Sequence, residues 1–103
     1  MPLYVSSHPL IQHKLTFLRN ALTSASDFRH VLKEIAFYLG FEATRDLALV
    51  PEQIVTTTGD LHVGNRVGQS IAIIPILRAG LGMTDALLEL MPYSNVYHLG
   101  VLE

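Results

Sequence analysis

The stretch that most constrains the fold runs from Ser70 to Met91, SIAIIPILRAGLGMTDALLELM. It opens with an isoleucine-rich apolar run, continues through a turn with one arginine and two glycines, and ends in an amphipathic helical pattern. The apolar run does not alternate with polar residues, which is typical of a strand buried on both faces of a parallel sheet. A strand, a glycine turn and a helix start together favour anion binding. The sequence therefore predicts an α/β fold with a candidate anion site at this turn.

Two prolines bound the predicted elements of this stretch. Pro75 has no N–H to donate to a sheet, so we expect it near the end of the strand. The helix is expected to begin near Gly82 or Met83 and to end at Pro92. Its apolar side would carry Met83, Leu87, Leu90 and Met91. The polar residues Thr84, Asp85 and Glu89 would face water or cap the first turn.

The turn between strand and helix carries the chemistry. Gly80 and Gly82 permit a positive φ and let a ligand approach bare backbone. The helix start offers unpaired N–H groups and the positive end of the helix dipole. Arg78 adds a permanent charge whose planar donors suit phosphate. The alternative is a tight strand-to-helix connection with a solvated arginine, the commoner meaning of a single glycine-bearing loop.

Composition suggests that the chain needs a partner surface. Half of the 103 residues are hydrophobic, 16% are charged, and the mean hydropathy is +0.35. A chain of this length buries a smaller fraction of its surface than the ~68–70% typical of 150 residues. We therefore expect it to be part of something larger and to self-associate.

Several classes of function are not expected. The net charge of −2 and pI near 6.2 show no excess of positive charge of the kind that binds nucleic acid. The chain has no cysteine, and its five histidines lack metal-ligand spacing, so we predict no metal site formed by the protein. No apolar run approaches the ~20 residues that span a bilayer, and no signal peptide is visible. A cytoplasmic location without membrane contact is expected.

The remaining elements can be placed by their periodicity. A first helix is expected from Pro9, with Ile11, Leu15, Leu18 and Leu22 on one face, and a second with Ser26 as its N-cap. Gly40 would be either the end of that second helix or a weak point before one more turn. A hairpin is predicted for Gln53–Thr58 and Leu61–Val63, with its turn at Gly59-Asp60. A second buried strand is predicted for Asn95–Val101.

The predicted organisation is one partial domain over residues 1–103. It comprises an N-terminal arm and two helices (1–47), a β-hairpin (48–69), and the start of a core sheet with the turn described above (70–103). The last segment forms one βαβ unit, expected to be parallel and right-handed. Because two parallel strands do not make a stable domain, the sequence resembles the opening half of an α/β domain.

Charged residues elsewhere give weaker signals. Glu42, Arg45 and Asp46 could form local ion pairs at a helix end, or could pin the hairpin or a partner chain. Lys14 and Arg19 could extend a positive rim toward an anion, although ordinary surface charge is the commoner explanation. No Ser-His-Asp set or carboxylate pair can be assembled from spacing, so no catalytic residue is predicted.

Three motifs together resemble one known family. In order and spacing they resemble motifs of the uracil phosphoribosyltransferases. They are HPLIQHKLTFLRN (His8–Asn20), FEATRDL (Phe41–Leu47) and IPILRAGLGM (Ile74–Met83). The resemblance implies a type I phosphoribosyltransferase fold. It also implies a cytoplasmic glycosyltransferase that converts uracil and 5-phosphoribosyl 1-diphosphate into UMP and diphosphate in pyrimidine salvage. Mg²⁺ accompanies the diphosphate, GTP activates some members, and members form oligomers.

The resemblance also assigns the turn. In the family the Arg-Ala-Gly turn is a strained loop that binds the diphosphate through its arginine and its backbone N–H groups. Carried across, Arg78 would bind diphosphate, with the backbone of Ala79 and Gly80 beside it. This agrees with the physical interpretation of the turn as an anion-binding concavity.

The sequence also departs from the family pattern. The family's acidic strand end with a Thr-Gly-Gly loop, which cradles the 5-phosphate, has no counterpart here, and neither has the segment that reads uracil. We therefore expect an N-terminal fragment or truncated form of a uracil phosphoribosyltransferase that is inactive alone. The alternative is a non-catalytic oligomerisation or regulatory module derived from that family.

Overall fold

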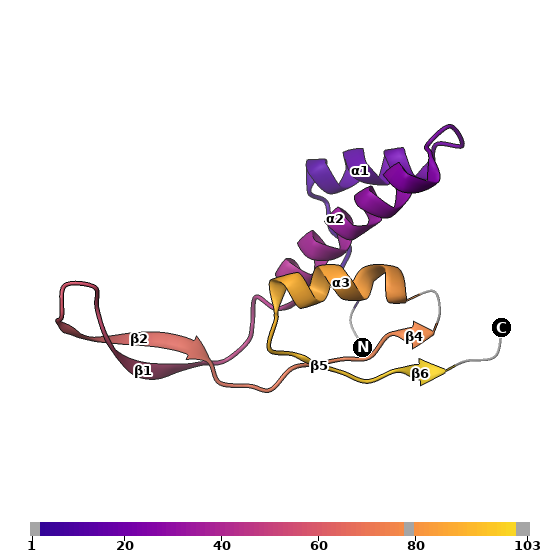
Figure 1. Ribbon diagram of the computed structural model, residues 1–103. Helices are drawn as coiled ribbons and strands as arrows, with labels where there is room; N and C mark the ends of the chain where they lie inside the picture. Colours follow the sequence, from indigo (N-terminus) through magenta and orange to yellow (C-terminus); the bar gives the residue numbers. More distant parts are fainter. Residues whose placement is uncertain (1–2, 78–79, 101–103) are drawn as a thin grey trace.

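The computed structural model describes residues 3–77 and 80–100 (Figure 1). The helices are α1 (Pro9–Arg19), α2 (Ala25–Ala43) and α3 (Leu81–Leu90). The strands are β1 (Leu49–Val55), β2 (Leu61–Val67), β3 (Ala72–Ile73), β4 (Ile76–Leu77), β5 (Asn95–Val96) and β6 (Leu99–Gly100). The predicted order of two helices, a hairpin and a parallel βαβ unit is confirmed. Within the described ranges, no helix has the length and apolar character to cross a membrane.

Side chains cap the first two helices. The Nδ1 atom of His8 accepts a hydrogen bond from the backbone N–H of Leu10 at 3.2 Å. The Oγ atom of Ser24 accepts one from the N–H of Asp27 at 3.1 Å. The prediction of Ser26 as the second cap was wrong, because Ser24 is the extended residue and Ser26 already lies in the first turn. Leu22 lies beyond α1 and is 92% exposed, so it is not part of the apolar face of that helix.

Gly40 lies inside α2 and allows α3 to approach closely. It is buried, and a Cβ atom placed on it would clash with Leu87 and lie 3.3 Å from Leu90, both of α3. The contact is reciprocal, because a Cβ atom on Gly82 of α3 would lie 3.2 Å from Leu32 of α2. The two helices therefore meet through glycines, and the helix continues past Gly40 instead of ending there.

The hydrophobic core is small. Its buried apolar residues are Ile11, Ile35, Ala36, Ile73 and Ala86. The radius of gyration is 17.5 Å, whereas a compact domain of 100 residues has about 13 Å. The chain is therefore elongated, with much apolar surface left outside its core, as its composition predicts.

Pro75 interrupts the parallel sheet without ending it. β3 pairs with β5 and β4 pairs with β6, and between these pairs the N–H of Leu99 donates to the carbonyl oxygen of Pro75 at 3.1 Å. The proline lacks a donor but its acceptor is used, so the strand resumes after it. Pro75 lies between the end of β3 at Ile73 and the end of β4 at Leu77, so it is near the strand's end as predicted, although the pairing continues past it.

Only one face of this sheet is covered in the chain. Ile73 and Pro75 are buried on one side of the strand, whereas Ile74 and Ile76, on the opposite side, are 59% and 53% exposed. Within the described residues the sheet is therefore buried on one face, and its other face is left open. α3 lies on one side of this sheet (Figure 1).

The hairpin is longer than the sequence predicts. β1 and β2 pair in an antiparallel register from Leu49↔Val67 to Val55↔Leu61. Gly59 has φ of 87°, which only glycine adopts easily, and the predicted turn at Gly59-Asp60 is confirmed. Pro51 weakened the strand signal in the sequence. A two-stranded hairpin tolerates it because both strands are edge strands.

An ion pair joins the first two helices. The Nζ atom of Lys14 lies 2.8 Å from Oε2 of Glu34, and Nε2 of His30 lies 3.5 Å from the other carboxylate oxygen. The hydrogen bond from Lys14 lowers the pKa of Glu34 below its ordinary value of 4.5. Lys14 therefore serves helix packing, and this pairing gives no support to the idea that it extends a positive rim around an anion.

This pairing predicts an acid-dependent loss of stability. Because the folded-state pKa of Glu34 is depressed, its contribution is present above the unfolded value and is lost as pH falls through the folded value. Glu34→Gln should cost about 0.2–1 kcal/mol at neutral pH and almost nothing near pH ~3. Urea unfolding of both chains at the two pH values measures this. A difference that persists in acid would contradict it.

Candidate functional site

The candidate loop lies at the edge where two parallel strands end. β4 ends at Leu77 and its neighbour β6 ends at Gly100, and α3 begins at Leu81 (Figure 1). The carboxyl edge of a parallel sheet is where ligands bind in open α/β folds. Of the three residues predicted for the site, Arg78 and Ala79 lie outside the described residues, and Gly80 is described. The strand-turn-helix arrangement predicted around them is present.

Gly80 adopts an ordinary right-handed conformation, with φ of −71° and ψ of −14°. Gly59 alone has a positive φ among the described residues, so the freedom that glycine offers at positions 80 and 82 is not used for a positive φ. Glycine is needed at position 80 for a different reason. A Cβ atom there would lie 3.0 Å from the nitrogen and 3.1 Å from the oxygen of Ile76, because the turn folds back tightly on its strand.

The N–H of Gly80 already has a partner. It donates to the carbonyl oxygen of Ile76 at 2.9 Å. This bond fixes the end of the loop against the strand that precedes it. In the conformation described, the Gly80 N–H therefore does not point freely toward a ligand.

The start of α3 has a different character from the starts of α1 and α2. Among the described residues, no side chain caps α3. The hydroxyl of Thr84 instead donates to the carbonyl oxygen of Gly80 at 3.2 Å. Thr84, which was expected to face water or to cap the first turn, is buried. In the first turn of α3 the N–H of Met83 donates to the carbonyl oxygen of Gly80 at 3.2 Å. The positive dipole end of the helix lies beside the loop, which favours an anion there.

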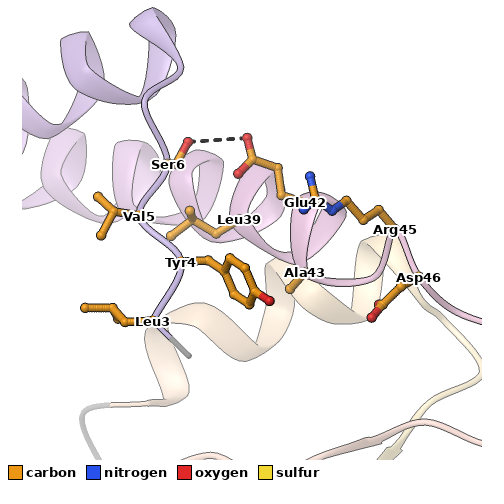
Figure 2. Close-up of a pocket in the computed structure, with 9 residues that line it drawn as sticks. All are labelled: Leu3, Tyr4, Val5, Ser6, Leu39, Glu42, Ala43, Arg45 and Asp46. Atoms are coloured by element: carbon orange, nitrogen blue, oxygen red, sulfur yellow. Dashed lines mark hydrogen bonds between the residues drawn. The ribbon is translucent and has the colours of Figure 1, made fainter. Parts of the chain in front are cut away.

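A cavity lies away from the loop. The cavity has a volume of about 690 Å³ and lies between the N-terminal segment and the end of α2 (Figure 2). The Oγ atom of Ser6 donates to Oε1 of Glu42 at 3.3 Å across one side of it. It is lined by Leu3, Tyr4, Val5, Ser6, Leu39, Glu42, Ala43, Arg45 and Asp46. None of these residues belongs to the candidate loop or its flanks.

The charged residues of the Phe41–Leu47 motif do not pair with one another. In the described part of the chain, Glu42, Arg45 and Asp46 form no ion pair, so the prediction of local ion pairs was wrong. Glu42 is engaged by Ser6 instead, through a contact 36 residues apart in sequence. No local spacing encodes such a contact, which explains why the cavity was not predicted.

One ion pair links α2 to the helix that follows the loop. The Nζ atom of Lys33 lies 2.8 Å from Oε1 of Glu89. The hydrogen bond from Lys33 to Glu89 raises the pKa of Lys33 above its ordinary value. Together with the glycine contacts, this pair fixes the position of α3. Contacts with α2, which is distant in sequence, therefore fix the position in space of the start of α3, beside the loop.

The chain is an α/β protein with a strand-turn-helix connection at the carboxyl edge of its parallel strands. The family model for uracil phosphoribosyltransferase matches residues 5–103. The chain belongs to the uracil phosphoribosyltransferase family.

Individual relatives agree with this assignment. The chain is 47% identical over 97 residues to a uracil phosphoribosyltransferase of Roseiflexus sp., which covers 94% of this chain and 46% of the relative. It is 44% identical over 99 residues to one of Burkholderia mallei, which covers 96% and 46%. The solved AQ2163 protein of Aquifex aeolicus superposes with a TM-score of 0.87 at 38% identity, over 97% of this chain and 48% of that one. The chain thus spans about half the length of these relatives.

Proposed function

We propose that the chain supplies the diphosphate-binding loop of a uracil phosphoribosyltransferase. The reaction transfers phosphoribosyl from 5-phosphoribosyl 1-diphosphate to uracil and yields UMP and diphosphate. The observation that carries the proposal is the α3 N-terminus without a side-chain cap, directly after β4, in a chain of this family. An anion placed there meets the positive end of the helix dipole.

The residues of the loop have separate roles in this proposal. The guanidinium of Arg78 contacts the diphosphate through paired N–H donors and stabilises the charge that develops as diphosphate leaves. The backbone of Ala79 and Gly80 lies beside it. Because the N–H of Gly80 is bonded to Ile76, its use by the ligand requires that bond to break. We therefore expect Arg78 and the first-turn N–H groups of α3 to make the first contacts.

Other features of the proposal come from family membership. Mg²⁺ would arrive with the diphosphate, whose oxygens are the hard ligands that this cation prefers. In the described ranges, no group of three or more His, Asp or Glu side chains is placed to hold a metal. A cytoplasmic location, a homo-oligomer and activation by GTP complete the proposal.

We infer that this chain alone does not catalyse the formation of UMP from uracil and 5-phosphoribosyl 1-diphosphate. The family's 5-phosphate cradle and uracil-reading segment have no counterpart among its 103 residues. The chain incubated with both substrates and Mg²⁺ should give no UMP above the background without protein, whereas a full-length family member assayed beside it should give UMP. UMP formation by the purified chain would overturn this part of the proposal.

A further inference from the structure

Thr84 is the one polar residue that is buried among those that the structure describes. It lies in the first turn of α3 and is 7% exposed. Its hydroxyl donates a hydrogen bond to the carbonyl oxygen of Gly80 at 3.2 Å. A hydroxyl removed from water costs free energy unless it keeps a hydrogen-bond partner. The bond between Thr84 and Gly80 therefore favours one conformation of the chain at the start of α3.

Both polar backbone atoms of Gly80 are engaged by neighbouring residues of the chain. On the strand side, the N–H of Gly80 donates to the carbonyl oxygen of Ile76 at 2.9 Å. On the helix side, the carbonyl oxygen of Gly80 accepts from the N–H of Met83 at 3.2 Å and from the hydroxyl of Thr84. Gly80 thus joins β4 to α3 through hydrogen bonds in both directions. Within residues 3–77 and 80–100, Thr84 supplies the side-chain bond in this set.

The residue at position 80 does not limit its own backbone rotation. The absence of a Cβ atom is required there, because such an atom would lie 3.0 Å from the nitrogen of Ile76 and 3.2 Å from the Cβ atom of Pro75. Glycine, however, rotates more freely about its backbone than any other residue. The orientation of the Gly80 carbonyl must therefore be fixed by contacts, and the buried hydroxyl of Thr84 is one that water does not readily replace.

The direction of this carbonyl matters for an anion in the loop. Gly80 directly follows Arg78 and Ala79, the other two residues of the proposed diphosphate site. A carbonyl oxygen carries a partial negative charge, so turning it toward diphosphate would repel the ligand, whereas backbone N–H groups attract it. The bonds from Met83 and Thr84 draw the oxygen back toward α3. They therefore keep an acceptor away from the side of the loop where an anion would bind.

We propose that Thr84 is a positioning residue for the diphosphate loop, because its hydroxyl holds the Gly80 carbonyl against α3 and away from the anion. Thr84 does not touch the ligand. The inference rests on the proposed diphosphate site and adds to it a residue from outside the Arg-Ala-Gly turn. The hydroxyl of this side chain, rather than its volume, then determines how well the loop binds diphosphate.

Substitutions at position 84 separate the hydroxyl from the volume of the side chain. Thr84→Val keeps nearly the same shape without a donor and should weaken the binding of Mg²⁺-diphosphate by about three- to tenfold in isothermal titration. Thr84→Ala removes the same donor with a smaller side chain and should weaken binding by a similar factor. Thr84→Ser retains the hydroxyl, so its affinity should stay within about twofold of the unsubstituted chain.

Ala86→Gly is the matched control for general loosening of the helix. Ala86 is buried in α3, and glycine there weakens the helix without removing a hydrogen-bond donor. Its diphosphate affinity should stay within about twofold of the unsubstituted chain. Circular dichroism checks that each variant keeps its helices. Equal weakening in Ala86→Gly and Thr84→Val would overturn a specific role for the hydroxyl.

A measurement without ligand separates this role from the proposed function. The carbon-13 chemical shift of the Gly80 carbonyl responds to the hydrogen bonds that this atom accepts. It should change in Thr84→Val and stay close to its original value in Thr84→Ser, and an unchanged resonance in Thr84→Val overturns the proposal. Saturable diphosphate binding of equal affinity in the unsubstituted chain and in Thr84→Val overturns the role of Thr84 alone. Absence of binding by the unsubstituted chain overturns the proposed function as well.

Discussion

Gly40→Val should lower the free energy of unfolding of this chain by about 2–3 kcal/mol. The site is buried, and any Cβ atom there meets the Leu87 side chain of α3. A β-branched side chain cannot be accommodated by a small rotation of Leu87, so α2 and α3 must separate. Urea unfolding of both chains, at equal concentration because the chain is expected to associate, measures the loss.

Two matched variants separate overpacking from helix propensity. Gly40→Ala adds one methyl group against the flexible end of Leu87 and gains about 1 kcal/mol of helix propensity, so its net effect should stay within about 1 kcal/mol. In a Leu87→Ala background the cost of Gly40→Val should fall by at least half, because the opposing side chain is gone. An equal cost in both backgrounds would show that the α2–α3 contact is not its origin.

The same contact links stability to the candidate site. α3 begins directly after the loop, and its position is set by Gly40, Gly82 and the Lys33–Glu89 pair. A displaced α3 carries its N-terminal N–H groups away from the end of β4. Gly40 thus contributes to the site without touching a ligand.

The order of elements could be predicted because its signals are local. The glycine with positive φ at position 59, the proline after α3 and the helical spacing of apolar residues in α1 all act within a few residues. One detail, the N-cap of α2, was predicted wrongly for a local reason as well. Ser24 and Ser26 are both plausible caps by residue type, and only the backbone conformation distinguishes them.

The packing between distant segments could not be predicted. Gly40 could be either a helix end or a weak point before one more turn, because glycine weakens helices, and the helix continues past it. Nothing nearby in the sequence shows that Leu87 lies over it. Thr84 was expected to face water or to cap the first turn, yet it is buried and its hydroxyl bonds back to Gly80. Burial of the sheet on both faces was inferred from an apolar run, whereas the described chain covers one face only.

The candidate site was located by its pattern, but its detail differs from the expectation. The strand-turn-helix arrangement around the loop is present, and Gly80 lies at the start of α3. Its glycine serves close packing on Ile76 rather than a positive φ. The roles of Arg78 and Ala79 remain proposals, because both residues lie outside the described part of the chain.

Arg78→Ala should weaken diphosphate binding by at least about tenfold, which corresponds to about 1.4 kcal/mol. A charge-assisted contact between guanidinium and phosphate is among the stronger polar interactions in proteins. Its loss leaves only the N–H groups and dipole of α3 to attract the anion. Arg19→Ala is the matched control, because Arg19 is an exposed arginine in the last turn of α1, outside the loop.

The central claim is that this chain carries the diphosphate loop of its family. Isothermal titration of Mg²⁺-diphosphate into the unsubstituted chain, Arg78→Ala and Arg19→Ala tests it most directly. We predict saturable binding by the unsubstituted chain and by Arg19→Ala, with strongly weakened binding by Arg78→Ala. Equal affinity in all three chains, or no binding by the unsubstituted chain, would contradict the claim.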